Sequence, residues 1–330
     1  MTVLASGSKG NSTVVSSSRT RILVDAGLSC RELFKRMQAA GEDPRTLDAI
    51  LVTHEHQDHV QGLAVTARKL GIPVYFTEPT HRAWVRWMTP RKRLTYADWL
   101  AQRKQQAEAA ASSEAALSAE TALSAEAEEK EAFEEEQASA AALSQESELA
   151  AKPETRREAD PCALPGGVEY FSAGQGFSVG DIAVTPFTIP HDAADPVGFV
   201  FEAEGIRIGL ATDLGYMPAN AAMRLRRCDV LMLESNHDLD MLRDGPYPWS
   251  VKQRVMSRVG HLSNHAAAEF LEESYDGQAE YVVLAHLSES NNLPELARIS
   301  AERALRDHMS LLANKLLLAT QEAPLESIVL

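Results

Sequence analysis

The stretch 53–59, which reads THEHQDH, constrains this chain more than any other part of it. It places three histidines and two carboxylates directly after Ala49–Val52, an apolar run typical of a short buried strand. His54 and His56 alternate, so an extended backbone would put both side chains on one side. The aspartate and histidine that end the stretch can face a second ion. A charged surface loop is the plainer interpretation, but imidazoles and carboxylates at this density favour a site for zinc, manganese or iron.

Length and composition limit the class of protein. The chain has 330 residues, enough for one large domain or two smaller ones. It has no apolar run of about 18 residues, so we expect no membrane span, and residues 1–7 lack the basic start and apolar core of a signal peptide. Its three cysteines are far apart, which fits a reducing compartment and argues against a disulfide framework or a cysteine zinc site. We therefore expect a cytoplasmic protein.

The formal net charge of −15 argues at first against a nucleic-acid partner. The excess is uneven, because residues 101–160 hold six basic and fifteen acidic residues and so contribute −9 of that charge. Several of the acidic residues would bind metal, and two divalent ions would add about four positive charges. A phosphodiester substrate is therefore compatible with the charge, provided that the basic surface is local.

The segment 101–160 differs from the rest of the chain. It is rich in Ala, Glu, Ser and Gln, and the sequence ALSAE occurs at 116–120 and again at 122–126. A spacing of six residues does not support a coiled coil. Ala and Glu favour helix, but there is too little apolar surface to bury. We expect a solvated, partly helical or disordered insertion, with a partner-binding arm as the alternative.

The elements before and after this segment alternate. Arg21–Gly27 is typical of a strand, and Ser29 is placed to cap a helix that runs to about Met37. Gly62–Leu70 is typical of a helix and Ile72–Phe76 of the next strand, so a layered α/β architecture is indicated. After the insertion, runs at 168–171, 177–179 and 182–187 predict strands of a second sheet. The loop Ser6–Ser12 could hold an anion on its backbone N–H groups or could simply be a hairpin turn.

Several apolar runs end in a residue that can bind metal or move a proton. These residues are His54, His56, His191, Asp213, Glu234 and His286. Side chains that follow strands of stacked sheets meet at one edge of those sheets. The sequence therefore predicts a metal site at that edge.

The order H-x-H-x-D-H, then His, then Asp, then His resembles the metallo-β-lactamase superfamily, along nearly the whole chain except about 101–160. The resemblance implies a four-layer αββα sandwich formed by a single domain, residues 1–330, with the insertion inside it. It also implies that Asp25 supports the metal loop, and that two divalent ions, Zn²⁺ or Mn²⁺, are bound. The implied ligands are His54, His56 and His191 for the first ion, Asp58, His59 and His286 for the second, and Asp213 as the bridge.

Further motifs resemble one branch of that superfamily. GHLSN at 260–264, HLSESNN at 286–292, LASGSKGN at 4–11 and ESNHD at 234–238 look like the YycJ/WalJ group, which is related to ribonuclease Z and regarded as DNA exonuclease-like. The resemblance implies a nucleic-acid substrate, DNA rather than RNA, and digestion in the 5′–3′ direction. Metal identity, the physiological substrate and the oligomeric state stay open.

The chemistry implied is phosphodiester hydrolysis by a metal-bridging hydroxide. By resemblance to ribonuclease Z, His261 lies beside the phosphate and Glu234 orients it, so that the pair stabilises charge and protonates the leaving oxygen. Asp58, His261 and Glu234 are therefore the candidate catalytic residues. Candidate phosphate contacts are Lys9, Lys252, Arg254 and Arg258, although such residues are more often simply solvated.

Two other functions compete with this one. A thioesterase or lactonase of the same fold would use the same ligands with an apolar acyl pocket. A non-catalytic metal-binding or regulatory module is the third, although a complete ligand set favours an enzyme.

Overall fold

The computed structural model describes residues 1–89, 100, 103–104, 160–306 and 315–330. The chain divides into two units, Met1–Thr89 with Asp160–Leu330, and Pro90–Ala159. The insertion expected at 101–160 lies outside the described residues except for 103, 104 and 160, so its solvated character stays a prediction. The fold below is that of the first unit.

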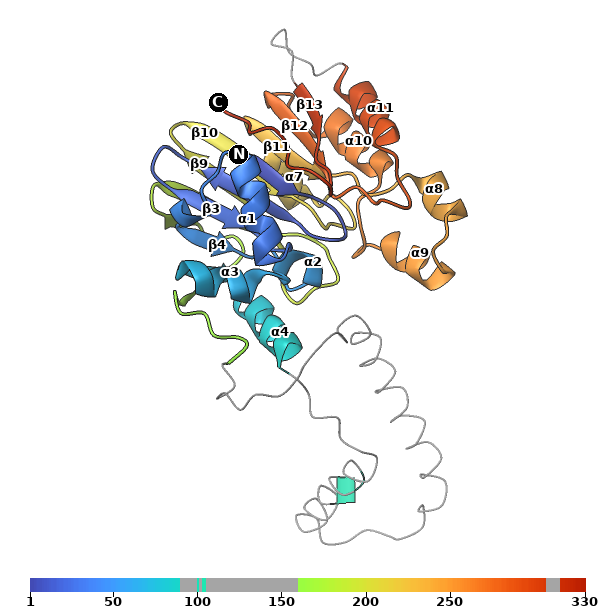
Figure 1. Cartoon of the computed structure of the whole chain (residues 1–330). Helices are drawn as coiled ribbons and strands as arrows, with labels where there is room; N and C mark the ends of the chain where they lie inside the picture. Colours follow the sequence, from blue (N-terminus) through green and yellow to red (C-terminus); the bar gives the residue numbers. More distant parts are fainter. Residues whose placement is uncertain (90–99, 101–102, 105–159, 307–314) are drawn as a thin grey trace. The chain divides into compact units, whose positions relative to one another are not determined.

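Two β-sheets form the centre of this unit (Figure 1). The first has six strands in chain order: β1 (Thr2–Ala5), β2 (Ser12–Ser16), β3 (Arg21–Val24), β4 (Ala49–Leu51), β5 (Val74–Phe76) and β6 (Val168–Tyr170). The second has seven, ordered from β13 back to β7: β7 (Phe177–Val179), β8 (Ile182–Thr188), β9 (Val197–Ala203), β10 (Ile206–Ala211), β11 (Val230–Glu234), β12 (Tyr281–Ala285) and β13 (Lys315–Leu318). In each sheet, antiparallel hairpins at one side give way to parallel strands at the other.

Most of the described helices cover the outer faces of the two sheets. The described helices are α1 (Cys30–Ala39), α2 (Gln57–Val60), α3 (Leu63–Leu70), α4 (Glu78–Met88), α7 (Ala219–Leu225), α8 (Leu239–Asp244), α9 (Trp249–Val255), α10 (Asn264–Glu273) and α11 (Pro294–Leu305), with a 3₁₀ turn at Pro44–Thr46. The expected cap of α1 is present, because Ser29 Oγ accepts the N–H of Glu32 at 3.4 Å.

Three apolar cores show that the layers are packed as helix, sheet, sheet and helix. One core lies between the sheets and joins side chains such as Val24 of β3 to Phe199 of β9. A second lies under α1, α3 and α4, where Trp84 is fully buried. A third lies under α7, α10 and α11. The predicted αββα architecture is therefore confirmed.

One strand was assigned to the wrong sheet. The run beginning at Val168 was expected in the second sheet, but β6 pairs in parallel with β5, with Val74 opposite Val168. The N–H of Val74 also donates to Gly167 O at 3.1 Å. The first sheet is therefore completed by a strand that follows the insertion, a long-range pairing that local sequence does not encode.

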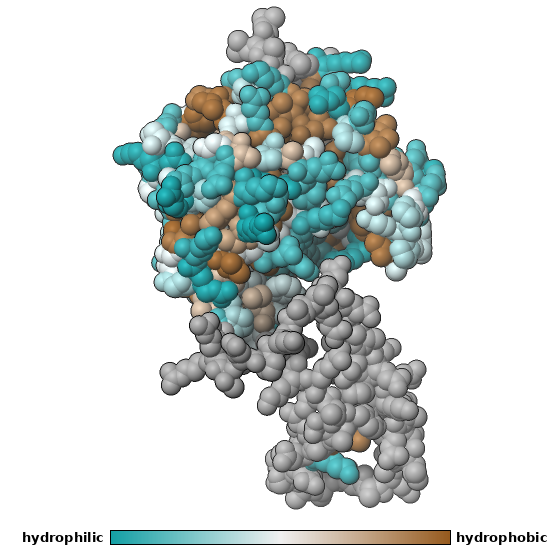
Figure 2. All heavy atoms as spheres, viewed as in Figure 1, coloured by the Kyte–Doolittle hydropathy of each residue, from teal (hydrophilic) through white to brown (hydrophobic). Residues whose placement is uncertain are grey.

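Parallel pairing decides where the loops meet. The strands β3 and β4 run in parallel, as do β10, β11 and β12, so their carboxyl ends lie at the same edge of their sheets. The surface itself is mixed: Figure 2 shows hydrophilic residues over much of one face and hydrophobic residues gathered over β12 and β13. None of the helices in the described part of the chain has the length and apolar character needed to cross a bilayer.

Candidate metal centre

The loop after β4 and the short helix α2 supply the first group of site residues. His54 and His59 are fully buried, and His56 and Asp58 are partly exposed. Asp25, which follows β3, holds this loop in place: it accepts the N–H and the hydroxyl of Thr53, both at 2.9 Å, and lies 2.8 Å from His59 Nδ1. The supporting role expected of Asp25 fits these contacts.

A loop in the first hairpin adds a residue to which sequence reasoning gave no role. Asn11 Nδ2 donates to Asp58 Oδ2 at 3.1 Å and lies 3.0 Å from His59 Nε2. The N–H groups of Gly7, Lys9, Gly10 and Asn11 all have acceptors within the protein. The loop is thus a turn between β1 and β2 that supports the metal loop, and those N–H groups do not form an anion site. The only signal for Asn11 was its place in the LASGSKGN motif.

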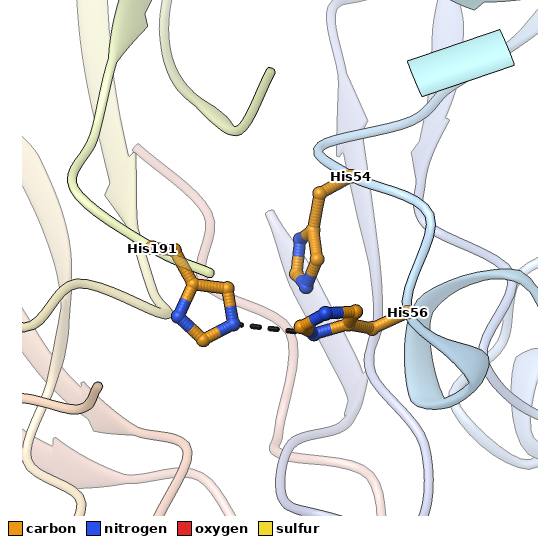
Figure 3. Close-up of side chains that lie close together, drawn as sticks. All are labelled: His54, His56 and His191. Atoms are coloured by element: carbon orange, nitrogen blue, oxygen red, sulfur yellow. Dashed lines mark hydrogen bonds between the residues drawn. The ribbon is translucent and has the colours of Figure 1, made fainter. Parts of the chain in front are cut away.

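Three histidines from two loops converge, as Figure 3 shows for His54, His56 and His191. Each uses one ring nitrogen on the protein: His54 Nδ1 on Thr53 Oγ1 at 3.0 Å, His56 Nε2 on the Asp192 carbonyl at 3.2 Å, and His191 Nδ1 on the Gly260 carbonyl at 3.1 Å. The other nitrogens face one another, with His191 Nε2 at 3.2 Å from His56 Nδ1. This arrangement is what fixes the tautomer of a metal-binding histidine.

A second group lies beside the first. Asp58, His59 and His286 each offer a ligand atom within 4.8 Å of the others. Asp213 meets both groups, because it forms a further cluster with His54 and His59. All the residues expected as ligands are therefore brought together, with Asp213 between the two trios.

Backbone strain marks the same edge. Asp25, Asp213 and His286 have φ of 59°, 63° and 56°, and they are three of the five non-glycine residues with positive φ in the described part of the chain. Each directly follows, or closely follows, a strand that leads into the site. Such conformations cost about 1–3 kcal/mol each and persist where surrounding contacts over-determine them.

The donor set fits divalent metal ions. His54 Nε2 and Asp213 Oδ2 are buried and have no hydrogen-bond partner, and an unpaired buried polar atom is costly unless it binds something. Burial and the neighbouring imidazoles lower the pKa of His54 well below its usual value, so it is neutral and able to ligate. Although burial opposes its charge, Asp213 and the other carboxylates around His286 raise its pKa to about 10. Positive charge stabilises these closely spaced carboxylates, and a bound metal ion would supply that charge.

Glu234, which is buried, and His261, which is partly exposed, form a hydrogen-bonded pair at the side of the two trios. His261 Nδ1 donates to Glu234 Oε1 at 2.8 Å, and Glu234 Oε2 accepts the N–H groups of Leu214 and Leu262 at 2.8 and 3.1 Å. Burial opposes charge on His261, but the Glu234 carboxylate raises its pKa. Glu234 Oε1 also lies 3.0 Å from His286 Nδ1. Glu234 therefore orients two imidazoles at once, of which His261 is the one with an exposed face.

The four candidate phosphate contacts differ in their surroundings. Lys252 was expected to face solvent or phosphate, and that was wrong: it is 8% exposed and its Nζ donates to the carbonyls of Arg243 and Gly245. Lys9 pairs with Glu289 and Arg254 with Asp192. Arg258 stacks its guanidinium over the Tyr216 ring, 4.2 Å from the centroid. Because its ammonium group is buried and bonded to two backbone carbonyls, Lys252 does not face a substrate.

Two other histidines lie close to these residues in the sequence. His265, four residues after His261, is exposed on α10. His237 is buried beside the site, and burial lowers its pKa to about 4.

Comparisons with known proteins agree with this geometry. A family model described as the metallo-beta-lactamase superfamily matches residues 5–108, and one described as a beta-lactamase superfamily domain matches 137–287. The chain is 31% identical over 306 residues to exodeoxyribonuclease YycJ of Bacillus anthracis, covering 92% of this chain and 88% of that protein. It is 30% identical over 298 residues to exodeoxyribonuclease WalJ of Streptococcus pneumoniae, covering 90% and 85%.

Solved structures share the fold at low sequence identity. The metallo-beta-lactamase fold protein YhfI of Bacillus subtilis superposes with a TM-score of 0.58 at 14% identity, covering 99% of this chain and 98% of that one. The short form of human tRNase Z superposes with a TM-score of 0.52 at 14% identity, covering 99% of each chain.

Proposed function

This chain belongs to the metallo-β-lactamase superfamily, and from that membership we propose that it is a metal-dependent phosphodiesterase that removes nucleotides from the end of a DNA strand. Its curated relatives YycJ and WalJ are named exodeoxyribonucleases, which supports DNA over RNA as the substrate. We propose 5′–3′ digestion in the cytoplasm. The cytoplasmic part of the proposal is supported by three cysteines that are all free thiols.

The observation that carries the proposal is the His261–Glu234 pair. A phosphodiester has a poor leaving group, an alkoxide, and its departure benefits from a proton donor. His261 is partly exposed beside the candidate ligands, and Glu234 is fully buried with both oxygens engaged. A thioester or lactone needs less help from an acid, so a dedicated pair of this kind favours the phosphodiester.

We assign the binuclear site as follows. His54, His56 and His191 would hold one ion, Asp58, His59 and His286 the other, and Asp213 would bridge them. Two divalent ions held there would lower the pKa of a bound water and neutralise charge on the phosphate. Zn²⁺ and Mn²⁺ both suit this set of imidazoles and carboxylates.

The residues of the chain then act on the substrate. The attacking water releases a proton to solvent and its oxygen bonds to phosphorus, the bond from phosphorus to the leaving oxygen breaks, and His261 gives that oxygen a proton that the imidazole regains from solvent. Glu234 favours the protonated form of His261, because it raises the pKa of that imidazole against the effect of burial, and it orients the ring through Nδ1. Asp58 is held by Asn11 and lies among the ligands, so it positions the nucleophile rather than acting as an independent base. The products are a mononucleotide and a strand shorter by one residue.

The test uses the purified protein with Mn²⁺ or Zn²⁺ and strands labelled at the 5′ or the 3′ end. Single- and double-stranded DNA and RNA are compared with a circular single strand, a thioester and a lactone. We expect release of mononucleotides from linear DNA, no cutting of the circle, and loss of activity with EDTA. If the protein hydrolyses the thioester or the lactone and leaves the DNA intact, it is a thioesterase or lactonase and not a phosphodiesterase.

A further inference from the structure

The segment Asp238–Gly260 links the two members of the His261–Glu234 pair and contains α8 and α9. In Figure 1 these two helices project from the sandwich rather than covering either sheet. Among the described residues, thirteen large hydrophobic side chains are exposed, and five of them lie in this short segment. They are Leu239, Trp249, Val251, Met256 and Val259, of which Trp249 is 62% exposed. This concentration of exposed apolar side chains within 23 residues makes the segment a candidate binding surface.

The segment is built firmly onto the metal centre. His261 N–H donates to Val255 O at 2.9 Å, and Asp192 N–H donates to Val259 O at 3.0 Å. Lys252 ties α8 to α9 by donating to two carbonyls at 2.7 and 2.8 Å. The exposed side chains are thus displayed on a braced support that is continuous with His261. A ligand bound on the segment would lie next to the place where the scissile phosphate is held.

Charge also favours an anionic ligand here. The segment holds four basic and three acidic residues in a chain whose net charge is −15. Arg258 is exposed, lies three residues before His261 and stacks over Tyr216, which lies three residues after Asp213. None of the described carboxylates forms a salt bridge with it, whereas Arg254 has Asp192 and Arg243 has Asp240 and Asp244. Its guanidinium is held in place and available for a phosphate.

We propose that the Asp238–Gly260 segment binds the single-stranded end of the nucleic-acid substrate, with Trp249 stacking on a base and Arg258 contacting a phosphate. This inference rests on the proposed phosphodiesterase function and adds how the strand is held. Exposed aromatic side chains and a nearby cation are the combination that proteins use to hold single strands without reading their sequence. An apolar partner would fit the hydrophobic side chains but would leave Arg258 without a counter-charge.

Binding is measured first, with the Mn²⁺-loaded protein and a fluorescein-labelled oligothymidylate whose linkages are all phosphorothioate, followed by anisotropy. Trp249→Ala should weaken binding by about 5- to 150-fold, the range of one base–aromatic stack. Arg258→Ala should also weaken binding and should reduce the dependence of log Kd on log salt by about one phosphate contact. Trp87→Ala and Arg243→Ala are the matched controls. The first removes an exposed tryptophan from α4, the second an exposed but ion-paired arginine from α8, and neither should weaken binding comparably.

Catalysis separates this inference from the function on which it rests. Bis(p-nitrophenyl) phosphate is a diester with no strand beyond the scissile phosphate, so Trp249→Ala and Arg258→Ala should lose much less kcat/KM on it than on single-stranded DNA. On single-stranded DNA the same variants should lose kcat/KM in proportion to their loss of binding. If the wild type hydrolyses neither substrate, the phosphodiesterase itself fails.

Two further outcomes would overturn the proposed contact. If the wild type cleaves DNA normally and both variants keep its DNA affinity and kcat/KM, the strand does not bind to this surface. A change in the sedimenting mass of Trp249→Ala, with unchanged DNA affinity, would assign the surface to contact between copies of the chain instead.

Discussion

At the scale of single residues, the metal-binding capacity of the site depends on which ring nitrogen of each histidine bonds to the protein and which is left for an ion. His54, His56 and His191 each direct one ring nitrogen to a protein acceptor, which for His191 is the carbonyl of Gly260. His59 directs Nδ1 to Asp25. The residue types of the site could be predicted from the sequence, because H-x-H-x-D-H is dense and its partners follow strands. The acceptors could not, because a backbone carbonyl carries no sequence signal.

Replacing Asp213 tests whether it is a bridging ligand or a supporting residue. It meets both trios, and its Oδ2 is buried without a hydrogen-bond partner, 3.3 Å from His59 Nε2. We expect Asp213→Ala to lose most of one of two metal equivalents and nearly all hydrolysis, more than the roughly 10- to 100-fold cost of removing an outer contact. Metal analysis of dialysed protein measures it, with Asp181→Ala, on a remote loop, as the control. Full activity in Asp213→Ala would remove the bridging assignment.

His261 should fail differently from a ligand. Removing a proton donor leaves the ions bound and raises the barrier, typically by about 10²–10⁴-fold. We expect His261→Ala to retain two metal equivalents and lose turnover on a phosphodiester in that range. Glu234→Gln should lose as much or less, and the double variant little more than His261→Ala, because the two residues act as a unit. If His261→Ala loses metal, His261 is a ligand and the assignment of His286 must change.

At the scale of elements, the loops after parallel strands position the chemistry, and their close approach leaves little room. A Cβ on Gly27, just after β3, would lie 1.6 Å from the carbonyl oxygen of Asp58. We expect Gly27→Ala to cost about 1–3 kcal/mol of unfolding free energy, the usual range for overpacking, and to weaken metal binding through Asp58. Urea unfolding and metal titration measure the two effects. Gly176→Ala, whose Cβ would meet only ordinary contacts at 3.6 Å or more, is the control. Equal metal affinity in both variants would contradict the proposed coupling.

Element prediction from sequence succeeded where local signals suffice. The cap at Ser29 and the helix α3 have local causes, and both are present. β6 was placed in the wrong sheet because its partner, β5, lies across the 101–160 segment and nothing near Val168 indicates the pairing. The prediction for Lys252 was wrong for a similar reason, since its carbonyl acceptors lie seven and nine residues away, on α8 and the turn that follows it.

At the scale of the whole molecule, the first prediction concerns the insertion. The segments on either side of it are joined by the pairing of β5 with β6 and by the core under α4. The insertion's composition gives it little apolar surface to bury. We therefore expect replacement of residues 105–155 by a short flexible linker to leave the melting temperature nearly unchanged, as measured by calorimetry. A large decrease would show that the segment packs on the rest of the protein.

The last prediction concerns the metal ions as a link between the two sheets. The expected ligands come from both halves of the chain: His54 to His59 from the first sheet, and His191, Asp213 and His286 from the second. Ions that bind only the folded arrangement stabilise it by mass action, by about 2.7 kcal/mol at 100 times the dissociation constant. For a protein of this size we expect Mn²⁺ or Zn²⁺ added to EDTA-treated protein to raise the melting temperature by about 5–10 °C. Mg²⁺ prefers oxygen ligands and should raise it less at the same concentration. Asp213→Ala should show a smaller rise than the wild type. A rise of the same size in Asp213→Ala would mean that the ions bind elsewhere, because removing the residue that meets both trios must weaken any metal link between the two sheets.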